Sequence, residues 1–101
     1  MPEQVKAASR KDILEGQSCV VRVKEREIAV FNVGGVYHAI DNVCLHRGGP
    51  LGGGVLNGKV VTCPWHGWEY DVTTGKVAQN PAVGVSCYKL EICGEDIFVD
   101  C

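Results

Sequence analysis

Two short segments, each carrying one cysteine and one histidine in the same order, constrain this chain more than any other feature. The first pair is Cys44 and His46, and the second is Cys63 and His66. Thiolate and imidazole in matched pairs are ligands for a transition metal, whereas calcium and magnesium take oxygen ligands. A fold that uses all four ligands must bring two loops that are distant in sequence face to face.

The order of the ligands favours a [2Fe-2S] cluster with two Cys on one iron and two His on the other. Because Cys and His lie so close together in each segment, one loop can reach both irons of a binuclear cluster. The serious alternative is a structural zinc site, since zinc takes the same four ligands tetrahedrally. Zinc motifs, however, usually pair Cys with Cys and His with His. We therefore interpret Cys44, His46, Cys63 and His66 as cluster ligands and keep zinc as an alternative.

Length and composition limit the number of domains, the possible partners and the compartment of this protein. With 101 residues, 46% hydrophobic and 22% charged, the sequence predicts one globular domain over residues 1–101. Its net charge is -2, and the absence of a long Lys/Arg run speaks against nucleic acid or an acidic membrane as partner. No apolar stretch approaches the ~18 residues of a membrane span, and residues 1–4 do not resemble a signal peptide. We expect a soluble cytoplasmic protein.

Many short strands between turns predict an all-β fold, an antiparallel sandwich or barrel. Ile28–Asn32 and Val36–Asp41 flank Gly34-Gly35, which is a hairpin signal. Cys87–Ile92 alternates clearly and predicts one continuous strand. Residues 53–60 almost match a phosphate-binding loop, but the pattern favours a wide hairpin that leads to the second ligand pair.

Three further local features predict a helix cap, a loop and the role of the remaining cysteines. Ser9 is expected to cap one helical turn, with Asp12 completing the capping box. Asn80-Pro81-Ala82 indicates a loop. The other four cysteines are interpreted as small strand residues or as the terminus, not as ligands; they are Cys19, Cys87, Cys93 and Cys101.

Around the two ligand pairs the chain resembles the Rieske ferredoxins that serve multicomponent oxygenases. The matching stretches are residues 39–51 and 63–71, followed by a Thr-Gly turn at 74–75 and a proline-containing third loop at 81–82. The resemblance covers nearly the whole chain. It implies three small stacked antiparallel sheets with the cluster at one tip, held by loops at about 42–58 and 63–71.

The resemblance also assigns the irons. It implies that Cys44 and Cys63 bind the inner iron, and that His46 and His66 bind the outer iron at the solvent edge. An apolar collar around the cluster would shield it or form a small docking patch for transient partners. The expected members of this collar are Leu45, Pro50, Leu51, Trp65, Trp68 and Pro81.

Respiratory and photosynthetic Rieske proteins are similar at the ligands but carry an additional disulfide across the cluster and a serine that bonds a cluster sulfide. In this chain the corresponding positions are Gly49 and Trp65 for the disulfide, and Trp68 for the serine. Tyr70 matches their sulfur-bonding tyrosine. Fewer hydrogen bonds stabilise the reduced cluster less, so we expect a potential toward the low end of the roughly -150 to +300 mV Rieske range.

The function implied by the resemblance is one-electron transfer from a flavoprotein reductase to a terminal non-haem iron oxygenase, through transient docking of a monomer at the cluster tip. The chain has three histidines, two of them assigned as cluster ligands, too few for an additional non-haem iron site with two His. It also lacks a dinucleotide or flavin motif, so we expect no enzymatic activity of its own. The alternatives are an accessory subunit similar to the small subunit of assimilatory nitrite reductase, a structural zinc-binding module and a redox sensor.

Overall fold

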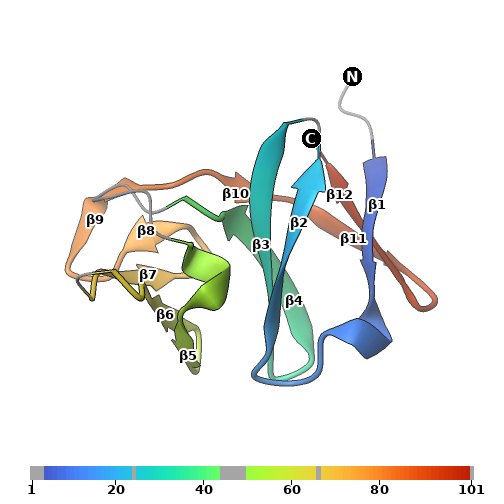
Figure 1. Cartoon of the computed structure of the whole chain (residues 1–101), viewed down its shortest axis with the longest axis horizontal. Helices are drawn as coiled ribbons and strands as arrows, with labels where there is room; N and C mark the ends of the chain where they lie inside the picture. Colours follow the sequence, from blue (N-terminus) through green and yellow to red (C-terminus); the bar gives the residue numbers. More distant parts are fainter. Residues whose placement is uncertain (1–3, 24, 44–49, 66, 101) are drawn as a thin grey trace.

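Short antiparallel strands make up most of the computed structural model, which describes residues 4–23, 25–43, 50–65 and 67–100 (Figure 1). In this part of the chain the strands form three sheets, so the predicted all-β fold is confirmed. The first sheet has the order β1 (Gln4–Ser9), β12 (Asp96–Asp100) and β11 (Leu90–Cys93). The second has the order β10 (Cys87–Tyr88), β4 (Val36–Asp41), β3 (Arg26–Val33) and β2 (Ser18–Val23). The third has the order β5 (Val55–Asn57), β6 (Val60–Thr62), β7 (Glu69–Asp71), β8 (Lys76–Val77) and β9 (Asn80–Gly84).

The hairpin between β3 and β4 forms where the sequence predicts it. Gly34 and Gly35 both have positive φ, 59° and 93°, which is the conformation of a type I′ turn. The turn sets the register of the two strands, so that Ile28 at the start of β3 pairs with Asp41 at the end of β4. The chain therefore leaves β4 and enters the first ligand segment at the end of the sheet opposite to this turn.

The segment Cys87–Ile92 is not the continuous strand that its alternation predicts. β10 pairs with β4 in the second sheet, whereas β11 pairs with β12 in the first, and Lys89 lies between them. Tyr88 is buried but Ile92 is 40% exposed. Alternation reports which side chains share a face, but it does not show that the chain changes sheets partway along.

Two other local predictions need correction: a helical turn does follow Ser9, but Ser9 does not cap it, and residues 80–82 are not a loop. The hydroxyl of Ser9 does not cap the 3-10 helix η1 (Arg10–Asp12); it donates to the carbonyl of Glu95 at 3.3 Å. The expected loop at residues 80–82 belongs to β9, which lies at the edge of its sheet. Pro81 is tolerated there because an edge strand does not need every backbone N–H.

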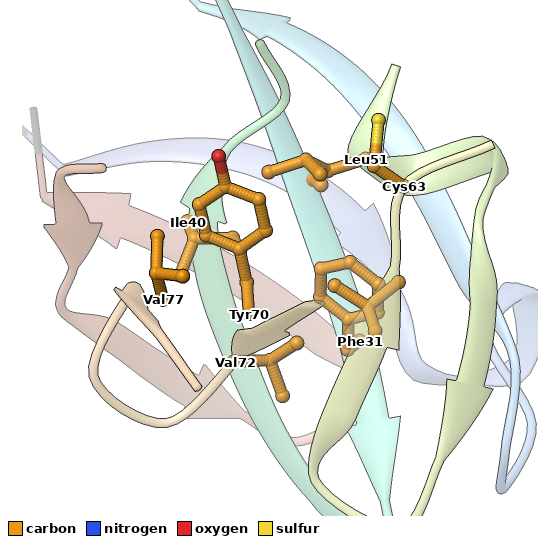
Figure 2. Close-up of a cluster of buried hydrophobic side chains, with 9 residues drawn as sticks. Phe31, Ile40, Leu51, Cys63, Tyr70, Val72 and Val77 are labelled. Atoms are coloured by element: carbon orange, nitrogen blue, oxygen red, sulfur yellow. The ribbon is translucent and has the colours of Figure 1, made fainter. Parts of the chain in front are cut away.

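The central sheet packs on both of its faces. Along β3, Ile28 and Val30 point into one buried group of side chains, while Ala29 and Phe31 point into the other, so residues 28–31 have no solvent face. The cluster between the first and second sheets includes Ile13, Ala39, Ile97 and Val99. The cluster between the second and third sheets also includes Ile40, Leu51, Val61, Cys63, Tyr70, Val72 and Val77 (Figure 2). Within the described residues, no helix is long and apolar enough to span a membrane.

Candidate metal centre

Cys63 is the one predicted ligand that the structure describes, and it lies directly after β6. Its side chain is 1% exposed and belongs to the buried cluster between the second and third sheets. Figure 2 shows its sulfur pointing to the same end of that cluster as the hydroxyl of Tyr70. The other predicted ligands lie outside the described residues; they are Cys44, His46 and His66.

The second ligand segment is closed at its base by strands β6 and β7. Thr62 pairs with Glu69 in the register of these strands. One residue further on, the N–H of Cys63 donates to the carbonyl of Trp68 at 2.7 Å. The ends of this segment are therefore held by the sheet, and a buried thiol sits at the point where it begins.

The first ligand segment is closed at its base as well. Val43 forms an antiparallel bridge with Pro50, and the N–H of Leu51 donates to the carbonyl of Asn42 at 2.6 Å. After this closure the chain makes a 3-10 turn, η2 (Leu51–Gly53), before it enters β5. This turn was not predicted, because residues 42–58 are rich in glycine and show no periodic pattern of apolar residues.

The structure brings the bases of the two ligand segments together. Leu51, at the end of the first, packs in the same buried cluster as Cys63, at the start of the second (Figure 2). The backbones also approach closely, because a Cβ added to Gly54 would lie 2.2 Å from the carbonyl oxygen of Thr62. The juxtaposition of two Cys/His segments and the soft donor atom of Cys63 fit a transition-metal cluster.

A third segment, residues 80–86, consists of β9 and the two residues after it, which lead back to the central sheet. It is hydrogen-bonded to the turn before β8 and to the end of β4. Val85 donates its N–H to the carbonyl of Gly75 at 2.8 Å. Ser86 donates its N–H to Oδ2 of Asp41 at 3.2 Å, and its carbonyl accepts from the N–H of Asp41 at 2.9 Å. This segment therefore contacts the strand that leads into the first ligand pair.

Asp41 also accepts a hydrogen bond from Tyr88 at 2.5 Å. The hydroxyl of Tyr88 in turn accepts one from Arg26 at 3.2 Å. Burial raises the pKa of Tyr88, and the hydrogen bond to Asp41 raises that pKa further, although Arg26 opposes this. The tyrosine therefore remains a neutral donor at physiological pH.

The members of the predicted apolar collar differ in exposure. Trp65 is 49% exposed, Trp68 and Pro50 are half-buried and Pro81 is exposed, so these four can contribute to a surface. Leu51 is fully buried and packs in the same group of side chains as Cys63, which suits shielding and not docking. Leu45 lies outside the described residues.

A hollow of about 350 Å³ lies beside the second ligand segment. Its lining includes Trp68 of the collar and Val83 of the edge strand β9, and Val83 is exposed. Val83 was not predicted as a surface residue of this site, because a loop at residues 80–82 gives no reason to assign a face to its side chain. The described residues that line it are Gly67, Trp68, Val77, Gln79, Asn80 and Val83.

The remaining described cysteines lie in strands, as predicted. Cys19 is in β2 and packs against the buried cluster between the first and second sheets. Cys87 and Cys93 are exposed thiols in β10 and β11. Burial raises the pKa of Cys19 and of Cys87, and the charge of Asp12 adds to the shift for Cys19. Protonated thiols are poor metal ligands. Cys101 lies outside the described residues.

Known proteins match this chain over nearly all of its length. The Rieske [2Fe-2S] domain family matches residues 3–89. The ferredoxin component of the naphthalene 1,2-dioxygenase system of Pseudomonas putida is 33% identical over 97 residues, which are 95% of this chain and 93% of that protein.

Solved structures give the same result. The ferredoxin of carbazole 1,9a-dioxygenase from Nocardioides aromaticivorans IC177 superposes with a TM-score of 0.88 at 28% identity, covering 96% of both chains. A chain from the complex of reduced oxygenase and oxidized ferredoxin in carbazole 1,9a-dioxygenase superposes with a TM-score of 0.87 at 30% identity. That match covers 96% of this chain and 92% of the other.

Proposed function

This chain belongs to the Rieske [2Fe-2S] domain family, and from that premise we propose that it carries single electrons from a flavoprotein reductase to a terminal non-haem iron oxygenase. The predicted family and its cofactor, a [2Fe-2S] cluster, are confirmed by the match. The observation that carries the proposal is the extent of the similarity. It covers 95% of this chain and 93% of a ferredoxin component, so nearly the whole of that relative corresponds to this sequence.

We assign the cluster to the two loops at about 42–58 and 63–71, within one domain over residues 1–101. Cys44 and Cys63 would hold the inner iron, and His46 and His66 the outer iron. The burial of Cys63 supports its inner position. When bound, the cluster accepts and releases one electron.

The surface around the second ligand segment supports transient docking. Trp65, one residue before the proposed outer ligand His66, exposes half of its side chain, and the hollow lined by Trp68 and Val83 lies beside the same segment. Large aromatic side chains contribute much of the binding energy in small interfaces. The carbazole 1,9a-dioxygenase relative has been captured in a complex of oxygenase and ferredoxin. We propose the same kind of contact here, made by a soluble cytoplasmic monomer that binds neither nucleic acid nor membrane.

Metal and sulfide analysis of the purified protein, with visible absorption and EPR, tests the cofactor assignment. We expect a reddish-brown protein with two irons and two labile sulfides per chain, the content of a [2Fe-2S] cluster. One zinc per chain from an iron-replete preparation would support the structural zinc module instead.

A reconstituted oxygenase assay tests the carrier role. The chain is added to NADH, a flavoprotein reductase and the terminal oxygenase of an aromatic-ring dioxygenase system. Turnover should require this chain, whereas the chain alone, with a chemical reductant and oxygen, should form no product. Product from the chain alone would contradict the proposal. A stable co-purifying enzyme complex would favour the accessory-subunit alternative.

A further inference from the structure

Asn42 occupies an unusual position at the start of the first ligand segment. It is 3% exposed, and the only other buried polar residue in the described part of the chain is Asn32. Its side-chain Nδ2 donates to Oε1 of Glu27 at 3.0 Å, and its Oδ1 accepts from the N–H of Gly52 at 2.6 Å. Its backbone N–H donates to the carbonyl of Glu27 at 2.9 Å, and its carbonyl accepts from Leu51 at 2.6 Å.

The chemistry of its partners fixes the orientation of this amide. The N–H of Gly52 can only donate, so it must face the side-chain oxygen of Asn42. An ionised Glu27 can only accept, so it must face the side-chain nitrogen. No other arrangement of the amide satisfies both contacts.

Gly52, on the far side of the first ligand segment, is held from three directions. Its N–H is bound by Asn42, and its carbonyl accepts from the hydroxyl of Ser18 at 2.8 Å. A Cβ at this position would lie 2.4 Å from Cγ2 of Val20 and 3.0 Å from Oδ1 of Asn42, so only glycine fits without a shift. Both ends of the segment that carries Cys44 and His46 are thus fastened to β2 and β3.

We propose that Asn42, oriented by Glu27, is a positioning residue that fixes the first ligand segment and so determines how tightly the cluster is held. The proposal rests on the proposed function, because it needs the cluster to be bound. A buried donor or acceptor that loses its partner raises the free energy of the folded state. At Asn42 this loss would loosen the base of the first ligand segment. The pairing of Asn42 with Glu27 therefore acts on cluster retention more than on the remainder of the fold.

A donor–acceptor exchange tests the pairing. In Asn42→Asp the nitrogen that faces Glu27 becomes a carboxylate oxygen, so two carboxylates oppose each other while the acceptor for Gly52 remains. We expect cluster loss to a chelator, followed by visible absorption at 25 °C, to be at least about tenfold faster than in the wild type. The EPR g values should change as well. In the double variant Asn42→Asp/Glu27→Gln, the new glutamine can donate to the new aspartate, and the total charge equals that of the wild type. Retention should be restored.

Two matched controls separate positioning from general destabilisation. Glu27→Gln alone keeps an acceptor for Nδ2 of Asn42 but loses the charge of the carboxylate, so its rate of cluster loss should lie between those of the wild type and Asn42→Asp. Asn32→Asp makes the same substitution at the other buried asparagine, which donates to the carbonyl of Ile13 and accepts from the N–H of Gly35, both at 2.8 Å. It should lower the midpoint of urea unfolding and leave the g values and the rate of cluster loss unchanged.

The outcomes distinguish this inference from the function on which it rests. Equal cluster loss in Asn42→Asp and wild type, equal loss in Asn42→Asp and Asn32→Asp, or a double variant no better than the single one would each overturn the positioning role. A wild-type chain without a [2Fe-2S] cluster would overturn the proposed function, and this inference with it.

Discussion

The hydroxyl of Tyr88 donates a 2.5 Å hydrogen bond to Oδ1 of Asp41, and this bond joins β10 to the last residue of β4. Burial and the adjacent carboxylate both raise the pKa of Tyr88 above its ordinary value of 10.0. A phenol whose pKa is higher in the folded chain than in the unfolded chain stabilises the fold fully at lower pH. That contribution is lost as the pH rises from about 10 through the folded pKa.

The substitution Tyr88→Phe should therefore have a pH-dependent effect. At pH 8 it should lower the free energy of unfolding by about 0.5–1.5 kcal/mol, the contribution of one hydrogen bond. Above about pH 10 the difference from the wild type should shrink, because the wild type loses this contribution. Urea unfolding at several pH values between 8 and 11 measures both effects. Tyr37→Phe, which removes a hydroxyl that donates to backbone carbonyls, is the control. A difference between Tyr88→Phe and wild type that stays constant up to pH 11 would show that the carboxylate has no part.

Cys63→Ser should abolish retention of the cluster and reduce stability. The thiol is buried at the start of the second ligand segment, and metal binding is coupled to folding at such sites. The visible spectrum and the midpoint of urea unfolding of the purified variant measure the two effects. Cys87→Ser, which changes an exposed thiol, should leave both unchanged. A Cys63→Ser variant with the full Rieske spectrum would refute the ligand assignment.

The midpoint potential should lie below zero, because Trp68 stands where higher-potential relatives have a hydroxyl that bonds a cluster sulfide. Trp68→Ser should raise the potential on the order of 60 mV, which corresponds to about 1.4 kcal/mol for one electron. Trp68→Phe keeps an aromatic ring packed against the buried hydrophobic side chains between the second and third sheets. It adds no hydrogen-bond donor, so it should not produce this rise in potential. Protein-film voltammetry at neutral pH measures all three proteins. A wild-type midpoint above about +150 mV would be incompatible with this explanation.

Gly75→Ala should weaken the contact between Gly75 and Val85, which holds residues 80–86 against the third sheet. Gly75 has a φ of 82°, and an added Cβ would lie 2.4 Å from the carbonyl oxygen of Val85. We expect a loss of about 1–3 kcal/mol in the free energy of unfolding. Gly58→Ala is the matched control, because Gly58 also has a positive φ, 63°, but an added Cβ would meet nothing within 4 Å. Equal losses in the two variants would mean that backbone conformation, not crowding, sets the cost.

Features encoded by neighbouring residues could be predicted from the sequence. The hairpin at Gly34-Gly35 follows from two adjacent residues that adopt positive φ readily, and the structure contains it. The metal loops were inferred from ligand spacing; the structure describes Cys63 of the four proposed ligands, and the assignment of all four stays a prediction. The break at Lys89 could not be predicted, because the partners of β10 and β11 are chosen by tertiary packing.

Contacts between residues that are distant in sequence account for the other differences between the predicted and the observed structure. Ser9 was expected to accept a hydrogen bond from the N–H groups of its own helical turn, but its hydroxyl donates instead to the carbonyl of Glu95, in the turn between β11 and β12. Leu51 was expected in a collar that either shields the metal centre or docks a partner, and the 3-10 turn after the first ligand segment places it among the buried side chains around Cys63. The pairing of Asn42 with Glu27 follows from the register of β3 with β4, which the sequence suggests only roughly.

The hairpin that joins β3 and β4 has a practical consequence for experiments on electron transfer. Val36, at the start of β4, is 58% exposed, and the six-residue strand separates it from the first ligand segment by about 20 Å. A fluorophore or a linker attached at residue 36 would sit at the end of β4 that is remote from the first ligand segment, so it would not block the surface around the ligands. Surface immobilisation through this position would leave the cluster end facing solution, where soluble partners could still exchange electrons with it.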